Sequence, residues 1–401
     1  MLLTSLYDLE PGMRVGAVVL NPRNPQFTLL KPGAVLTGPI IAGLRKLGTT
    51  QVWVEHDLTD DLDQAVSPDV LRVKLVVYNH LKEDLAKLAG QALTNAHIGT
   101  YRRAITDMVK ALVAHPYAGL ADQIYDVDAQ LVSHCTNTAY LATLVGLELK
   151  SYVISERPKV PEKRAQNLVN LGLGAMLHDV GKVQLDAEAA ARHEIFQPLE
   201  EGEKSSYDTH PMLGFETLRG EGIPPTVRHV ARYHHQRFNG TGWPEQAVDP
   251  AAAAAGETIP RRLHIFTRLV AAANVLDNLM RDADGRQRLP VQALHDFASP
   301  RFDGWFDPIV RTTMLRCLAP FPVGSQVELN DGRQAVVIEP NSSQPCRPTV
   351  RLLELAGANT PPTIRLADDP QVSIASYAGK DVRPWMFELG ANVAAPPAEA
   401  A

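Results

Sequence analysis

The spacing of hydrophobic and polar positions changes twice along the chain and divides it into three regions. Up to about residue 60, short alternating runs such as QVWVEH predict strands, and Thr37 is placed to cap one short helix. From about 62 to 320, apolar residues recur every three or four positions, which predicts helices. After this stretch the alternation returns on both sides of Asp331-Gly332, a dipeptide typical of a β-hairpin turn.

These patterns predict a mainly α protein, in which a helical bundle follows a small α/β module and precedes a small β-rich domain. Pro225 is expected at the start of one helix of the bundle, and Asp208 is expected to cap another. The strands near the end fit a small barrel or sandwich. The predicted parts are an N-terminal module (1–60), a helical connector (61–119), a helical domain (120–318), a β-rich domain (319–390) and a disordered tail (391–401).

Composition and charge exclude several classes of protein. The 401 residues are 45 % apolar and 21 % charged, as in an ordinary globular protein, and the net charge of −6 gives no attraction to nucleic acid polymers or to a membrane surface. No apolar run approaches the roughly 18 residues that cross a bilayer, and the first residues lack the features of a secretory signal. The three cysteines, Cys135, Cys317 and Cys346, are too few for a disulfide framework, and we expect a cytoplasmic protein.

Histidines are concentrated in the helical region, where seven of the 13 lie between His134 and His235. The adjacent pair His178-Asp179 places an imidazole beside a carboxylate, and a carboxylate can bridge two cations. Neighbours such as His234 and His235 point about 100° apart on a helix and can serve separate ions. Nitrogen and oxygen ligands without a thiolate suit iron, manganese, nickel or zinc better than calcium or magnesium.

Two metal ions about 3.5–4 Å apart can clamp a phosphodiester and lower the pKa of a water between them. Lys182, one turn past the His-Asp pair, and Arg237, three residues after His234, are placed to meet phosphate oxygens. Each short motif has a plainer interpretation: a lone histidine such as His134 is more often a hydrogen-bonded core residue than a ligand. The hypothesis therefore depends on the motifs occurring together and in one order.

That order resembles the HD-GYP family, bacterial metal-dependent phosphodiesterases of the HD superfamily that hydrolyse cyclic di-GMP. The resemblance covers about residues 120–315 and implies an HD-type helical bundle. The segments that carry it are HDVGK (178–182), YDTHPMLGFETL, HHQRFNGTGWP and TRLVAAANVLDNL.

Carried over residue by residue, the resemblance implies two divalent transition-metal ions, iron or manganese before zinc or nickel. Asp179 would bridge the ions and Lys182 would contact the substrate phosphate, so these two are the implied catalytic residues. The implied metal ligands are His134, His178, Asp179, His210, His234 and His235, with Asn274 at the position of the family's last aspartate ligand. The implied substrate-binding residues are Lys182, Arg237, Gly240, Gly242, Trp243, Pro244 and Arg286.

Several positions depart from the family pattern. Asn274 is neutral where the family has an aspartate, which should weaken binding of the ion it faces. Gln130 replaces a glutamate that holds a third metal in some members, so we expect two ions. Trp243 replaces the tyrosine of the name motif and preserves stacking without a phenolic hydroxyl, and Gln236 replaces a glutamate.

Two hypotheses of different class follow, and we favour the first. The chain hydrolyses cyclic di-GMP to linear pGpG, with GMP as a further product, in bacterial second-messenger signalling. Alternatively, it is a degenerate cyclic di-GMP-binding or protein-interaction module with little or no turnover. Hydrolysis of another phosphoester is a third, weaker interpretation. Expected partners are cyclic di-GMP, a diguanylate cyclase or other signalling protein, and a second copy in a homodimer, but no nucleic acid polymer and no membrane.

Overall fold

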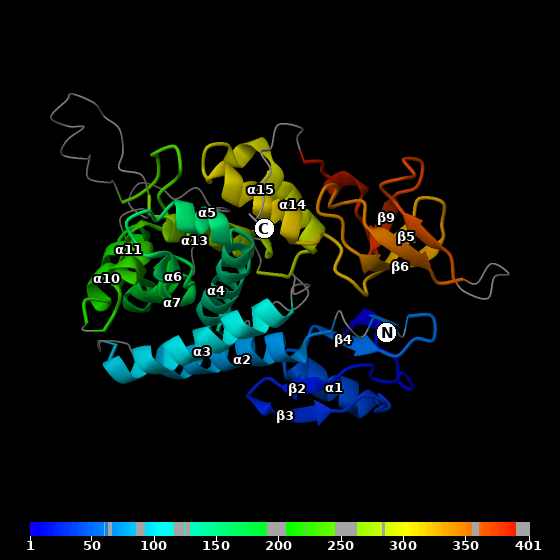
Figure 1. Cartoon of the computed structure of the whole chain (residues 1–401). Helices are drawn as coiled ribbons and strands as arrows, with labels where there is room; N and C mark the ends of the chain where they lie inside the picture. The colour runs from blue at the N-terminus through cyan, green and yellow to red at the C-terminus, as the bar shows by residue number, and fades with distance from the viewer. Residues whose placement is uncertain are drawn as a thin grey trace.

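A computed structural model describes most of the chain and shows a helical body with two smaller β-containing parts beside it (Figure 1). Its described residues form three hydrophobic clusters, the largest in the helical body. The described ranges are 1–59, 61–62, 66–85, 93–115, 124, 129–190, 206–220, 222–244, 263–282, 285–354 and 361–389. The predicted disordered tail, 391–401, lies outside them.

The N-terminal part is the small α/β module that the alternating pattern predicts. Thr37 caps the helix α1, because its side chain accepts a hydrogen bond from the Ile40 N–H at 3.4 Å. Leu36, Leu44 and Val52 belong to its hydrophobic cluster. Its elements are β1 (Leu2–Ser5) paired antiparallel with β4 (Gln51–Val54), β2 (Val19–Asn21) paired with β3 (Asn24–Leu30), and α1 (Gly38–Lys46).

Two long helices, α2 (Pro68–Leu85) and α3 (Asn95–Ala114), pack on each other and lie along one side of the helical body (Figure 1). The centre of the body is α4 (Gln130–Glu148), which packs against α2, α7 (Val169–Leu177) and α13 (Ile265–Leu279). Nearly every residue of α4 and α13 is buried, as expected for helices that are apolar or small on all faces.

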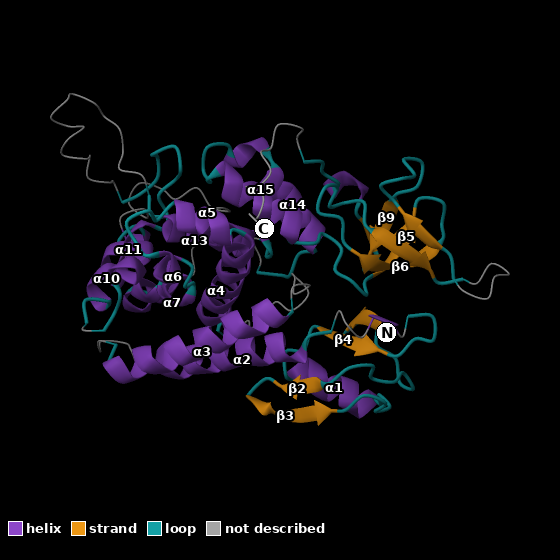
Figure 2. Ribbon diagram, in the orientation of Figure 1, coloured by secondary structure: helices purple, strands orange, loops and turns teal. Residues whose placement is uncertain are grey.

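The remaining helices complete the body, shown in purple in Figure 2. One of them begins at Pro225 as expected, whereas α10 begins at His210 after Thr209, so the prediction that Asp208 caps it is wrong. Pro211 explains the shift, because it would be the third residue after an Asp208 cap and has no N–H to donate to the capping carboxylate. The other helices are α5 (Lys150–Ser155), α6 (Glu162–Ala165), η3 (Val180–Gln184), α8 (Ala187–Ala190), α10 (His210–Thr217), α11 (Pro225–Tyr233), α14 (Pro290–Ala298), η4 (Pro300–Phe302) and α15 (Pro308–Cys317).

The C-terminal part contains a six-stranded antiparallel sheet in the order β10-β9-β5-β6-β7-β8. The predicted hairpin at Asp331-Gly332 joins β5 to β6, and Gly332 supplies the positive φ of 87° that the turn requires. Among the described residues the sheet is open, because β10 and β8 do not pair. The elements are β5 (Gln326–Leu329), β6 (Gln334–Glu339), β7 (Thr349–Leu352), β8 (Thr363–Arg365), β9 (Ile374–Tyr377), β10 (Lys380–Asp381) and η5 (Arg383–Trp385).

The two β-containing parts touch although they are far apart in the sequence. The Leu3 N–H donates to the Gly324 carbonyl at 2.9 Å, and Arg351 forms two hydrogen bonds with the Asp61 carboxylate, at 2.6 and 2.8 Å. A Cβ at Gly324 would lie 2.3 Å from the Trp53 ring, so only glycine fits there. Within the described ranges, none of the helices has both the length and the apolar character needed to cross a membrane.

Candidate metal centre

The predicted ligands meet at one buried place because helix ends converge there. His178 and Asp179 follow α7, His210 opens α10, and His234 and His235 follow α11. His134, in contrast, lies inside α4, and Asn274 and Asp277 lie on the neighbouring α13. In three of the motifs, the candidate ligands thus lie directly at the end or the start of a helix.

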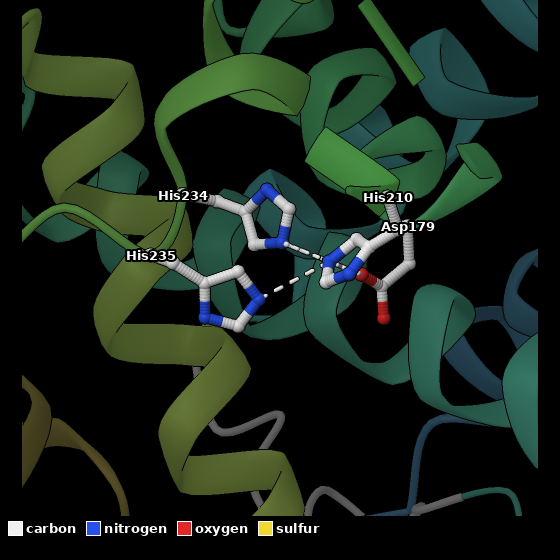
Figure 3. A group of neighbouring side chains, drawn as sticks. All are labelled: Asp179, His210, His234 and His235. Carbon is white, nitrogen blue, oxygen red and sulfur yellow. Dashed lines mark hydrogen bonds and ion pairs between the residues drawn. The ribbon is translucent and has the colours of Figure 1, made fainter. Parts of the chain in front are cut away.

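One group of possible ligand atoms joins Asp179 to three histidines (Figure 3). The Asp179 Oδ1 atom lies 3.2 Å from the Nε2 atom of His210 and 3.3 Å from that of His234. The Nε2 atom of His210 also lies 3.2 Å from that of His235. All four ligand atoms lie within 4.8 Å of one another, which is close enough for one ion to contact them together.

A second group contains His134, His178 and the same Asp179. The Asp179 Oδ2 atom lies 3.6 Å from the Nε2 atom of His134 and 3.5 Å from that of His178. The two oxygens of one carboxylate therefore face two different sets of imidazoles. This arrangement fits a carboxylate shared between two cations.

The imidazoles are oriented by backbone carbonyls three residues earlier in the chain. The Nδ1 atoms of His178, His210 and His234 lie 2.7, 2.7 and 3.0 Å from the carbonyl oxygens of residues 175, 207 and 231. A carbonyl only accepts, so each Nδ1 carries the hydrogen and each Nε2 carries a lone pair. Lone pairs that face each other and a carboxylate repel unless a cation lies between them, so these donors fit a metal ion.

Asp277 orients His134, the candidate ligand that lies inside α4. Its Oδ2 atom lies 2.7 Å from the His134 Nδ1 atom, and both side chains are buried. The His134 Nε2 atom is thereby directed towards His178, 3.2 Å away. A carboxylate behind a ligating imidazole is a common device that fixes the ring and raises its basicity.

Burial sets the protonation states of the centre. It lowers the pKa of His178 and of His235 well below the usual value and lowers the pKa of His210 to about 4. Burial alone would raise the pKa of Asp179, but the Lys182 ammonium at 2.7 Å holds it well below its usual value. At neutral pH His178, His210 and His235 therefore offer neutral imidazoles and Asp179 an ionised carboxylate, the states that bind metals.

Lys182 is buried at the edge of the centre, with 5 % of its surface exposed. Burial disfavours its charge, but Asp179 raises its pKa above the usual value, so the ammonium persists. Its Nζ atom also lies 5.2 Å from the centre of the Tyr207 ring. A fixed positive charge next to Asp179 is well placed for an anionic ligand.

Asn274 lies in the same pocket as His234 and His235, with 4 % of its surface exposed. Its Oδ1 atom accepts a hydrogen bond from the Asn278 amide at 3.1 Å. The structure therefore places Asn274 at the centre as expected, while its role as a ligand stays a prediction.

The loop with the Gly-Thr-Gly-Trp-Pro motif folds back on the second histidine of the pair. The Trp243 ring stacks on His235, with ring centres 3.9 Å apart and planes inclined by 16°. Gly240 and Gly242 have positive φ angles, and a Cβ at Gly242 would lie 2.3 Å from the His235 carbonyl oxygen. The Trp243-Pro244 peptide bond is cis. The loop thus forms a wall of the centre.

The two arginines predicted to bind substrate differ in their positions. The Arg237 guanidinium lies 3.5 Å from the centre of the Trp305 ring and lines the pocket that Asn274 faces. Arg286, in contrast, is exposed on a turn, where its backbone N–H binds the Asp282 carboxylate. The described contacts thus bring Arg237 to the centre and do not place Arg286 there.

Three residues of the site were not predicted as part of it. Tyr207 is buried, its carbonyl orients His210, and its ring contacts Trp243 edge-on. Trp305 supports Arg237, and Asp277 orients His134. For Tyr207 a signal was available, since it stands three residues before His210, the spacing of the other histidine-carbonyl pairs.

Comparisons with known proteins agree with this geometry. Residues 131–279 match the family model described as the HD domain. Over 275 residues, 68 % of this chain and 59 % of the relative, the chain is 23 % identical to a Pseudomonas aeruginosa protein named cyclic di-GMP phosphodiesterase PA4108. Over 148 residues, 36 % of this chain and 35 % of the relative, it is 28 % identical to a Xanthomonas campestris protein named cyclic di-GMP phosphodiesterase response regulator RpfG.

Residues 131–279 thus match the HD domain, and this match, together with the names of the two relatives, is consistent with the resemblance to the HD-GYP family. The chain spans less than two thirds of the length of either relative.

Proposed function

We propose that the chain is a metal-dependent phosphodiesterase that hydrolyses cyclic di-GMP to linear pGpG. The observation that carries the proposal is the Asp179 carboxylate, which faces two groups of histidines beside the buried ammonium of Lys182. The names of both relatives specify cyclic di-GMP phosphodiesterase and support the same substrate. Cleavage of pGpG to GMP, a diguanylate cyclase partner and a homodimer stay predictions.

The donor set supports two divalent transition-metal ions, with iron or manganese as the first candidates. Asp179 would belong to both sites: His134 and His178 would complete one, and His210, His234 and His235 the other. When bound, two such ions polarise a phosphoryl oxygen and supply an activated water at neutral pH. Asn274 would face the second site as a neutral donor.

The protein's own residues would bind and orient the substrate. The Lys182 ammonium would pair with a phosphate oxygen while Asp179 holds it in place. Trp243, stacked on His235, would offer an aromatic wall for a base and exclude water from one side of the centre. Arg237, held over Trp305, would present a second positive charge to the dinucleotide.

The alternative of a binding module without turnover rests on the neutral Asn274. A lost ligand charge weakens a metal site without abolishing it, and six of the seven predicted ligands are unchanged. Both relatives carry the name of an enzyme. We therefore favour hydrolysis.

The proposal is tested by product analysis. Protein purified without air and loaded with iron or manganese is incubated with cyclic di-GMP, and the products are separated by chromatography. We expect linear pGpG from the wild type, none from His178→Ala, and wild-type activity from the control His80→Ala on α2. Absence of product from the metal-loaded wild type would refute hydrolysis of this substrate.

A further inference from the structure

A second concave region lies at the end of the helical body away from the metal centre. It is a pocket of about 600 Å³ between α3, the segment that joins α5 to α6, and the start of α7. Five of its lining side chains are cations: Arg102, Arg157, Lys159, Lys163 and Arg164. Among the described residues, the lining contains no aspartate and no glutamate.

In the part of the chain that the structure describes, the positive charges of this pocket have no carboxylate paired with them. Among the described residues, none of the five cations forms an ion pair with a carboxylate. Burial lowers the pKa of Arg157, and no carboxylate offsets that effect. The whole chain carries a net charge of −6, so the gathering of five cations runs against its average composition. Like charges held together repel, and a bound anion would relieve this repulsion.

Neutral contacts hold two of the arginines in place. The Arg157 Nη1 atom donates to the Ala165 carbonyl at 2.7 Å, and its guanidinium lies 4.6 Å from the centre of the Phe266 ring. Arg102 donates to the Asn170 side-chain oxygen at 3.3 Å. A guanidinium group that is already held in place can donate to two phosphate oxygens at once, and it loses little conformational freedom when it binds them.

The shape of the region favours a small ligand over a macromolecular surface. Its volume of about 600 Å³ lies within the range of small-molecule sites, roughly 300–1,000 Å³. The side-chain amides of Asn167 and Asn170 add neutral hydrogen-bonding groups beside the cations. Such a lining suits a ligand with a phosphate group and a polar remainder.

The pocket is separate from the metal centre. It lies at the start of α7 (Val169–Leu177), whereas His178 follows the end of that helix. Nine residues at 1.5 Å per residue separate the two places by about 13 Å. One phosphate cannot contact both.

We propose that this pocket, lined by Arg102, Arg157, Lys159, Lys163 and Arg164, is a second anion site that binds a small phosphate-bearing ligand. The proposal does not depend on the function assigned to the metal centre.

Titration calorimetry with inorganic pyrophosphate on the full chain tests the proposal. We expect saturable binding of one pyrophosphate at the pocket, weakened roughly tenfold or more by Lys163→Glu/Arg164→Glu, since two attractive charges become repulsive. Both residues are exposed, so the fold should be retained, which circular dichroism checks. The control Lys31→Glu/Lys380→Glu makes the same charge change at exposed positions elsewhere and should bind as the wild type does.

His178→Ala distinguishes the pocket from the metal centre, because it should leave this binding unchanged. The proposal is overturned if the wild type shows no saturable binding, if Lys163→Glu/Arg164→Glu binds with wild-type affinity, or if His178→Ala abolishes binding. Equal binding of a hexaglutamate peptide would also overturn it, because the site would then recognise acidic chains in general.

Discussion

At the scale of single residues, Asn274 departs from the HD-GYP pattern that the chain resembles, which has an aspartate ligand at this position. Its side chain is buried in the pocket of His234 and His235, and Asn278 donates to its oxygen. An amide oxygen can bind a metal ion, but it lacks the charge of a carboxylate. The second metal site should therefore be weaker than it would be with aspartate.

Asn274→Asp adds a carboxylate at this position and should tighten metal binding about tenfold, with a matching rise in turnover at limiting metal. Metal titration and the rate of pGpG formation measure the two effects. Asn278→Asp adds the same charge one helical turn away and should give a smaller gain. Unchanged affinity in Asn274→Asp would show that this side chain does not face a metal ion.

The sequence alone indicated most residues of the candidate centre, because five of the predicted ligands, four histidines and Asp179, sit in short motifs at helix ends. It was not sufficient for Trp305 and Asp277, whose roles depend on contacts with Arg237 and His134 across the fold. Such pairings arise from tertiary packing, and the spacing of residues along the sequence does not reveal them. Arg286 shows the converse: a position suggested by the family pattern is exposed on a turn.

At the scale of elements, η3 and α10 approach so closely that they require a glycine. A Cβ on Gly181 would lie 2.0 Å from the His210 carbonyl oxygen and 2.6 Å from the Gly214 nitrogen, both backbone atoms. The glycine of the HDVGK motif therefore lets His210 come within reach of Asp179. This gives a physical reason for a motif position that carries no side chain.

Gly181→Ala should force these elements apart, destabilise the fold by about 1–3 kcal/mol and lower the metal content. Thermal denaturation and metal analysis of the purified variant measure the two effects. Gly43→Ala is the matched control, because a Cβ there meets nothing within 4 Å and should leave stability equal or slightly higher. Wild-type stability and metal content in Gly181→Ala would contradict the close approach.

The helix α13 begins with a histidine cap that should make stability depend on pH. The His264 Nδ1 atom accepts from the Phe266 N–H at 3.1 Å, and burial, with the nearby Arg157, lowers the pKa of His264 to about 4. Below about pH 6.5 the His264 imidazole takes up a proton in the unfolded state, whereas in the folded state it does so only near pH 4. Stability therefore falls as the pH drops from about 6.5 towards 4.

His264→Asn keeps an N-cap acceptor without a titrating ring. Between pH 7 and 4.5, the free energy of unfolding should fall by roughly 2 kcal/mol less in this variant than in the wild type. Urea denaturation at both pH values measures the difference. Parallel pH dependence of the two proteins would count against the lowered pKa of His264.

At the scale of the whole molecule, the N-terminal module and the C-terminal sheet lie against each other beside the HD domain (Figures 1 and 2). The pattern of hydrophobic positions predicted both parts and their class. It could not predict their contact, because Leu3 meets Gly324 and Asp61 meets Arg351 across about 300 residues of sequence. Only folding brings such partners together, so their pairing leaves no local pattern.

The proposed function depends on Asp179 being shared between two metal ions. Its most direct test is the metal content per chain of anaerobically loaded wild type and of the isosteric variant Asp179→Asn, by elemental mass spectrometry. We expect about two ions in the wild type and a loss at both sites in Asp179→Asn, whereas His134→Ala should lose about one. A wild type that holds a single ion at saturation, or an Asp179→Asn variant with wild-type content, would contradict it.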